Sequence, residues 1–147
     1  LMFHFNNTKF VVLRIFFITL FNTCLVVTAS SEVLNVDNNE LQLLISKGTP
    51  VVDIREKFEW KETGILPESH LITFFDSEGK YDAEKWLAEL KMIASPDDPI
   101  IIICRSGRRS LIVADYLLRK KNFLKVYNVE AGINGWKRAN LETKAFQ

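Results

Sequence analysis

Short apolar runs alternate with longer amphipathic segments along most of this chain. The apolar runs have the length of strands and cover residues 51–54, 100–103 and 125–129, with a weaker run at 70–72. The run at 100–103 consists of four isoleucines with no polar position between them. Continuous β-branched runs of this kind are typical of a strand that is buried on both faces of a parallel sheet.

Five segments between and around these runs have the spacing of helices. They cover residues 38–47, 56–62, 83–94, 111–121 and 133–138. The first follows a capping-box pattern of Asp37 and Glu40 and ends at Gly48. In the third and fourth segments, apolar residues recur every three or four positions, which predicts helices with one buried face.

Strands that alternate with helices predict a single α/β domain with a mainly parallel central sheet and helices on both faces. We expect this domain to span residues 33–140 and residues 141–147 to form a C-terminal tail that is loose from residue 143 onward. In parallel sheets, sites form beyond the carboxyl ends of the strands. Cys104 is expected to be the last residue of the isoleucine strand, which puts it where a site is expected.

Residues 1–29 differ from the rest of the chain. They contain Lys9 and Arg14 but no acidic residue, and an apolar stretch follows Arg14. Val27 and Ala29 have the spacing of a signal-peptidase site. The pattern predicts a secretory signal peptide and an exported protein, periplasmic in a Gram-negative source. An uncleaved membrane anchor is the alternative, because the apolar stretch has about the 20 residues that span a bilayer.

Charge and cysteine content narrow the function classes. The whole chain has a formal net charge of +1. Without residues 1–29, Lys plus Arg falls from 19 to 17 while Asp plus Glu stays at 18, so the net charge becomes −1. This balance gives no electrostatic reason to expect a nucleic-acid partner. Cys104 and His70 are then the single cysteine and the single histidine, so neither an internal disulfide nor a four-ligand zinc site can form.

No cofactor or metal is expected, because the sequence has no phosphate-binding loop, no dinucleotide fingerprint and no metal-ligand spacing. The residues after Cys104 instead indicate a reactive thiol. Segment 104–110 reads Cys-Arg-Ser-Gly-Arg-Arg-Ser, between the isoleucine strand and a helix. Gly107 permits a tight or left-handed backbone, in which successive amides can point inward and bind an anion. The next helix N-terminus and three arginines add positive charge, which favours a thiolate or a persulfide anion and attracts an oxyanion donor.

Three segments in the same order resemble the rhodanese family of sulfurtransferases. The loop 104–110 is similar to the family's active-site loop, residues 51–69 resemble its first signature, and residues 126–136 resemble its C-terminal glycine–tryptophan segment. With the N-terminal pattern, the chain resembles single-domain, phage-shock-type periplasmic members. Two positions depart from the family pattern: Ile65 stands where the family has histidine, and Ala131 replaces the first glycine of a pair.

The resemblance implies a two-step catalytic cycle. Cys104 would take a sulfane sulfur from thiosulfate or a similar small-molecule donor and hold it as a persulfide. Cyanide or another thiol would then accept the sulfur. Arg109 is implied to face the bound anion, whereas Arg105 and Arg108 match variable positions that tune the substrate.

The remaining implied roles concern the shape of the loop. Ser106, Gly107 and Ser110 complete the substrate-binding loop, and we also expect the Ser110 hydroxyl to cap the following helix. Asp53 and Arg55 match a family pair that braces the loop from the neighbouring strand, which is a structural role.

Several alternatives are open on the sequence alone. A Cys104–His70 dyad could activate the thiol. A cysteine phosphatase or arsenate reductase would need arginine at the sixth position after the cysteine, where this chain has Ser110. A rhodanese-like binding module without turnover, or a relay fed with persulfide by a partner protein, would keep the same fold. If the N-terminal segment is cleaved, no stable membrane contact is expected.

Overall fold

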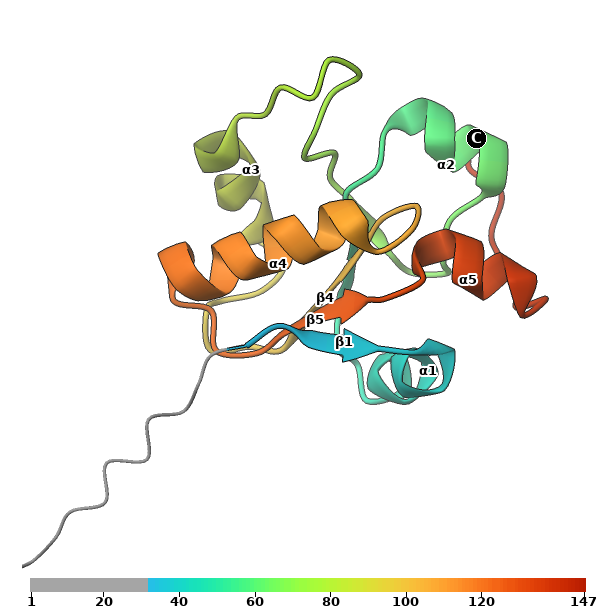
Figure 1. Ribbon diagram of the computed structural model, residues 1–147, viewed down its shortest axis with the longest axis horizontal. Helices are drawn as coiled ribbons and strands as arrows, with labels where there is room; N and C mark the ends of the chain where they lie inside the picture. The colour runs from blue at the N-terminus through green and yellow to red at the C-terminus, as the bar shows by residue number, and fades with distance from the viewer. Residues whose placement is uncertain (1–31) are drawn as a thin grey trace, which may run out of the picture.

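A five-stranded sheet organises the fold, in a computed structural model that describes residues 32–147 (Figure 1). The strands are β1 (Leu34–Val36), β2 (Val51–Asp53), β3 (His70–Leu71), β4 (Ile100–Ile103) and β5 (Val126–Val129). They lie in the order β1-β5-β4-β2-β3, and every neighbouring pair is parallel. The predicted parallel α/β fold is therefore confirmed, whereas the predicted signal peptide lies outside the described residues.

Helices pack on both faces of this sheet. They are α1 (Asn38–Ser46), α2 (Lys57–Thr63), α3 (Ala83–Leu90), α4 (Arg108–Lys121) and α5 (Gly132–Arg138). α3 and α4 cover one face, and α1 and α5 cover the other (Figure 1). Within residues 32–147, no helix is long and apolar enough to cross a membrane.

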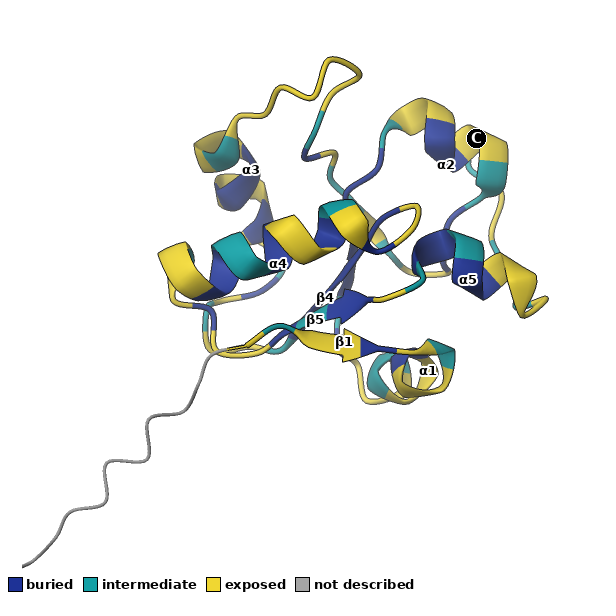
Figure 2. Cartoon of the chain, viewed as in Figure 1, coloured by how far each residue is buried: buried dark blue, intermediate teal, exposed yellow. Residues whose placement is uncertain are grey.

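The central strand β4 is buried on both faces, as its four isoleucines predict (Figure 2). Ile100 and Ile102 belong to the apolar cluster under α3 and α4, and Ile101 and Ile103 to the cluster under α1 and α5. Cys104 continues this alternation and lies in the cluster under α4. The strand itself ends at Ile103, so Cys104 is the first residue of the loop rather than the last residue of the strand.

Strand β1 was not predicted from the sequence. It forms one edge of the sheet, with Leu34 paired to Tyr127 of β5. Only Val36 of its three residues is buried, whereas Leu34 and Asn35 are exposed. A single inward-facing residue is too little to produce a readable alternation of apolar and polar positions.

The expectation of a loose C-terminal tail is wrong. Ile65 and Lys144 form an antiparallel bridge through two backbone hydrogen bonds of 2.9 and 2.8 Å. The ring of Phe146 packs edge-on against Trp60 of α2, with 5.4 Å between the ring centroids. These partners lie far earlier in the chain, so no local pattern within residues 141–147 could predict the contacts.

The burial of β4 predicts a large effect on stability. Ile102→Ala should lower the free energy of unfolding by about 2–5 kcal/mol, because the substitution removes apolar contacts and leaves a cavity. Leu124→Ala is the control at a 65% exposed apolar side chain and should change it by less than about 0.5 kcal/mol. Urea unfolding followed by tryptophan fluorescence measures both, and equal effects would contradict the burial pattern.

Candidate active site

Cys104 lies where the carboxyl end of β4 meets the N-terminus of α4. Its side chain is only 1% exposed. The hydroxyl of Ser110 donates a hydrogen bond of 3.2 Å to its Sγ atom. Ser110 is fully buried in the first turn of α4 and does not cap the helix, because Gly107 occupies the N-cap position. The expected capping role of Ser110 is therefore wrong, since its hydroxyl is directed to the sulfur instead.

Gly107 is required at the turn from the loop into α4 for two reasons. Its φ angle is +84°, in the left-handed region that side chains rarely adopt. A Cβ atom there would also lie 1.9 Å from the carbonyl oxygen of Glu130, which follows β5. The predicted left-handed backbone at Gly107 is thus confirmed.

The start of α5 holds the loop from the other side. The Ile133 amide donates to the carbonyl of Cys104 at 2.9 Å, and the Asn134 amide donates to the carbonyl of Arg105 at 3.1 Å. A Cβ atom on Gly132 would lie 2.5 Å from the loop backbone, so only glycine allows this close approach. Two successive loop carbonyls are therefore turned toward α5.

The loop amides have no such partners. Within residues 32–147, the backbone amides of residues 105–110 donate to no acceptor. Three of these amides belong to the first turn of α4, where a helix leaves its N–H groups unpaired and carries partial positive charge. A run of unpaired amides ending in a helix N-terminus can bind an anion next to Cys104.

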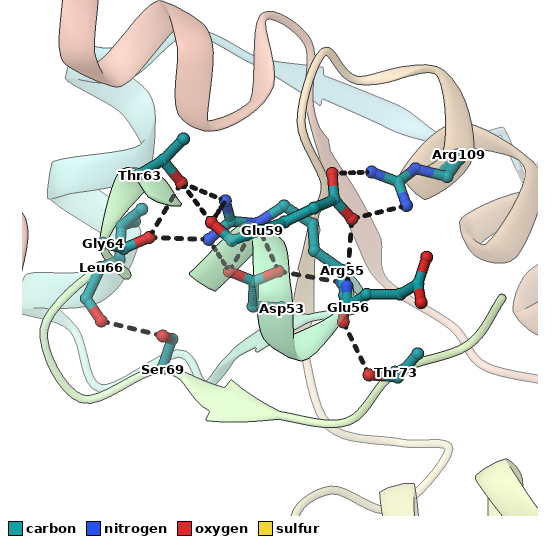
Figure 3. Close-up of polar contacts among 10 residues, drawn as sticks. All are labelled: Asp53, Arg55, Glu56, Glu59, Thr63, Gly64, Leu66, Ser69, Thr73 and Arg109. Atoms are coloured by element: carbon teal, nitrogen blue, oxygen red, sulfur yellow. Dashed lines mark hydrogen bonds and ion pairs between the residues drawn. The ribbon is translucent and has the colours of Figure 1, made fainter. Parts of the chain in front are cut away.

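Arg109 forms an ion pair with Glu59 of α2, which the sequence analysis did not single out (Figure 3). The two contacts measure 2.9 and 2.6 Å and join both carboxylate oxygens to the two terminal nitrogens. The Glu59 side chain is 5% exposed and that of Arg109 is 30% exposed. Because a guanidinium has five N–H groups, Arg109 keeps donors for a further ligand.

This pair changes the titration of both groups. Burial alone would raise the pKa of Glu59, but the hydrogen bonds from Arg109 and from the Glu56 amide, with the charges of Arg109 and Arg55, bring it below its usual value of 4.5. The hydrogen bond to Glu59 raises the pKa of Arg109 further, and the nearby Cys104 and Asp53 contribute in the same direction. Arg109 lies in the first turn of α4, the helix that begins where the cysteine loop ends.

Asp53 and Arg55 form a fully buried ion pair at the end of β2 (Figure 3). Arg55 Nε lies 2.9 and 3.0 Å from the two oxygens of Asp53, and a terminal nitrogen lies 2.6 Å from one of them. Its other contacts reach the Thr63 hydroxyl at 2.6 Å and the Gly64 carbonyl at 2.9 Å. The pair has a structural role, but it joins the sheet to the C-terminal end of α2, and no hydrogen bond links it to the cysteine loop 104–110 that it was expected to brace.

The other predicted residues are all exposed. Arg105, Ser106 and Arg108 are exposed, and neither arginine forms an ion pair with any residue from 32 to 147. His70 begins the edge strand β3, two strands away from β4. No hydrogen bond joins it to Cys104 in the described part of the chain, so a dyad is not formed. No group of three potential metal ligands gathers among these residues either.

Comparison with known proteins agrees with this architecture. Residues 37–139 match the family described as Rhodanese-like domain. The chain is 27% identical over 113 residues to thiosulfate sulfurtransferase GlpE of Vibrio cholerae, covering 76% of this chain and 95% of that protein. It is 26% identical over 113 residues to thiosulfate sulfurtransferase 18 of Arabidopsis thaliana, covering 74% and 82%. A rhodanese-like domain protein of Staphylococcus aureus superposes with a TM-score of 0.55 at 25% identity, covering 76% and 99%.

Alanine substitutions at Gly107 and Gly79 distinguish the cost of a left-handed backbone from the cost of a collision between the new Cβ atom and its neighbours. Gly107→Ala should destabilise the protein by more than about 2 kcal/mol, because the new Cβ would meet a backbone carbonyl that cannot move aside. Gly79 has a similar φ of +77° but nothing within 4 Å of a Cβ atom. Gly79→Ala should therefore cost only the left-handed strain, about 1 kcal/mol. Thermal unfolding compares them, and equal losses would argue against the close approach of Glu130.

The lowered pKa of Glu59 predicts a pH-dependent contribution to stability. A carboxyl with a lower pKa in the folded state stabilises the protein above its unfolded pKa and loses that effect as pH falls through its folded pKa. Glu59→Gln should therefore cost about 2 kcal/mol at pH 7, and the difference from wild type should shrink below pH 4.5.

The exposed Asp115–Arg119 pair on α4 supplies the control. Asp115→Asn should change stability by less than about 1 kcal/mol at pH 7, because solvent screens exposed pairs. Urea unfolding at several pH values measures both variants. A Glu59→Gln difference that stays constant down to pH 3 would show that the Glu59 charge contributes nothing.

Proposed function

Since this chain belongs to the rhodanese-like domain family, we propose that it is a sulfurtransferase that carries sulfane sulfur as a persulfide on Cys104. The observation that carries this proposal is the position of Sγ at the start of a loop with unpaired amides. Such a loop can hold a negatively charged sulfur and a negatively charged donor together. The names of two relatives, both called thiosulfate sulfurtransferase, agree with thiosulfate as the donor.

In the first step, the Cys104 thiolate attacks the outer sulfur of thiosulfate. A bond forms between Sγ and that sulfur, the S–S bond of thiosulfate breaks, and sulfite leaves with the electron pair. The product is the Cys104 persulfide anion, so atoms and charge balance. The loop amides would bind the oxygens of the donor, and the exposed Arg105 and Arg108 would attract its two negative charges.

In the second step, a nucleophile such as cyanide attacks the outer sulfur of the persulfide. The carbon–sulfur bond forms, the bond to Sγ breaks, and thiocyanate leaves while the Cys104 thiolate returns. A persulfide bond is about 2.05 Å long, so the outer sulfur reaches beyond the buried thiol toward the acceptor. The Ser110 hydroxyl, hydrogen-bonded to Sγ, can stabilise the charge that returns to Sγ.

The same geometry argues against phosphoryl transfer. That reaction requires a guanidinium directed at the bound phosphate from the end of the loop. The sixth residue after Cys104 is Ser110, whose hydroxyl is bonded to the sulfur. Arg109, one position earlier, places both terminal nitrogens on Glu59. Neither residue presents a bidentate clamp to a tetrahedral phosphate.

Incubation with thiosulfate should therefore add one sulfur to the protein, about 32 Da in intact mass, through a covalent cysteine intermediate. Cyanide should then remove the added mass. Cys104→Ser should gain nothing, whereas Cys24→Ser, at the other cysteine of the chain, should gain the sulfur as the wild type does.

The opposite results have distinct meanings. A sulfur gain that persists in Cys104→Ser would place the persulfide on another residue and refute the proposed site. If the wild type gains no sulfur while its thiol still reacts with an alkylating reagent, thiosulfate is not the donor. The protein-fed persulfide relay would then become the leading function for the same cysteine.

A further inference from the structure

The C-terminal segment 141–147 leads from α5 to α2, where its later residues are bound. The indole N–H of Trp136 donates to the Glu142 carbonyl at 2.8 Å and holds the beginning of the segment on α5. The bridge between Ile65 and Lys144 then attaches the segment to the residue that follows Gly64. A Cβ atom on Gly64 would lie 3.0 Å from the Lys144 carbonyl, which shows how close the approach is. Figure 1 shows the C-terminus beside α2.

Trp60 of α2 is the side chain that this segment covers. The Phe146 ring meets it edge-on at 5.4 Å and an angle of 65°. The indole N–H of Trp60 is buried and has no hydrogen-bond acceptor within residues 32–147. Because no polar contact fixes this ring, packing alone sets its position. Phe146 supplies the aromatic part of that packing.

Helix α2 needs such external contacts. It has only seven residues, and helices of this length are not stable on their own. Arg55 holds its C-terminal end through Thr63 and Gly64. The Trp60–Phe146 contact is a second attachment, on the side of the segment 141–147. The rotation of α2 between these attachments decides where its remaining side chains point.

Glu59 and Trp60 are neighbours on α2, so a shift or rotation of the whole helix that follows a loss of packing at Trp60 also moves the Glu59 carboxylate. That carboxylate accepts two short hydrogen bonds from Arg109. Because the pair is bidentate, the Arg109 guanidinium follows the Glu59 carboxylate when α2 moves. Arg109 lies in the first turn of α4, five residues after Cys104. A shift of α2 is thus transmitted to the Arg109 guanidinium at the start of the helix that follows the cysteine loop.

We propose that Phe146 is a positioning residue for the active site. Its ring fixes Trp60, and through α2 it sets the position at which Glu59 holds Arg109 beside the cysteine loop. The effect on catalysis rests on the proposed sulfurtransferase function, whereas the placement of the guanidinium does not. The two statements can therefore be tested separately.

The kinetic test is a double-mutant cycle on the full chain, with thiosulfate as donor and cyanide as acceptor. Phe146→Ala should raise KM for thiosulfate about fivefold and leave kcat within about twofold, since positioning errors weaken donor binding first. Phe146→Tyr keeps the ring and should retain the wild-type KM. In a Glu59→Ala background, Phe146→Ala should cause no further change, because no side chain of residue 59 then attaches Arg109 to α2.

Leu141→Ala is the matched control for general loosening of the C-terminal segment. Leu141 is half-buried and packs on the cluster under α1 and α5, which contains no residue of α2. It should lower the melting temperature but leave KM unchanged. The proposal is overturned if Leu141→Ala raises KM as much as Phe146→Ala does. It is also overturned if the Phe146 and Glu59 effects multiply, or if Phe146→Ala leaves KM at the wild-type value.

A second readout does not depend on sulfur transfer. In a Cys24→Ser background, the alkylation rates of Cys104 by iodoacetate and by iodoacetamide report the positive charge near the thiol, because only iodoacetate is anionic. Phe146→Ala should lower the iodoacetate rate relative to the iodoacetamide rate about threefold. Phe146→Tyr should leave this ratio unchanged. An unchanged ratio would refute the positioning role. A lowered ratio in a protein that takes no sulfur from thiosulfate would refute only the proposed function.

Discussion

The orientation of the cysteine loop depends on two hydrogen bonds from the start of α5. Because Ile133 and Asn134 bind the carbonyls of Cys104 and Arg105, these two peptide groups cannot turn their oxygens toward the sulfur. The amides that follow are then left without acceptors and can serve an anion. Glycine at 107 and 132 is the steric condition for this arrangement, since a Cβ atom at either position would collide with backbone. The glycine–tryptophan segment therefore shapes the cysteine loop through its backbone.

The three loop arginines divide into two kinds once their partners are known. Arg109 is partly buried and paired with Glu59, so α2 holds its guanidinium in one place. Arg105 and Arg108 extend into solvent from the loop and the first turn of α4, where unpaired charges attract anions over several ångströms. In the proposed site, Arg109 thus helps to orient a bound anion, whereas Arg105 and Arg108 attract the anion from solvent. A cluster of three arginines in sequence does not reveal this division.

Local patterns predicted what local forces determine. The isoleucine run, the capping box at Asp37 and the glycine turn at 107 all have the predicted structure, because each depends on neighbouring residues or on one buried strand. What escaped prediction depends on distant partners. Glu59 looks like an ordinary charged residue of a short helix, and its burial follows from an arginine fifty positions later. The segment 141–147 and strand β1 likewise owe their order to contacts with α2 and β5.

A charge as deeply buried as Arg55 contributes little net stability, because desolvation offsets most of the Coulomb attraction to Asp53. An apolar pair could fill the same volume, but it could not form the hydrogen bonds to the Thr63 hydroxyl and the Gly64 carbonyl. Arg55 forms both while its charge is paired with Asp53 at the end of β2. Arg55 thereby attaches α2 to the strand next to β4, and Glu59 attaches the same helix to α4. The cysteine loop lies between β4 and α4. The buried charges thus fix α2 relative to both elements that bear the loop, which a less directional apolar contact would leave free to slide.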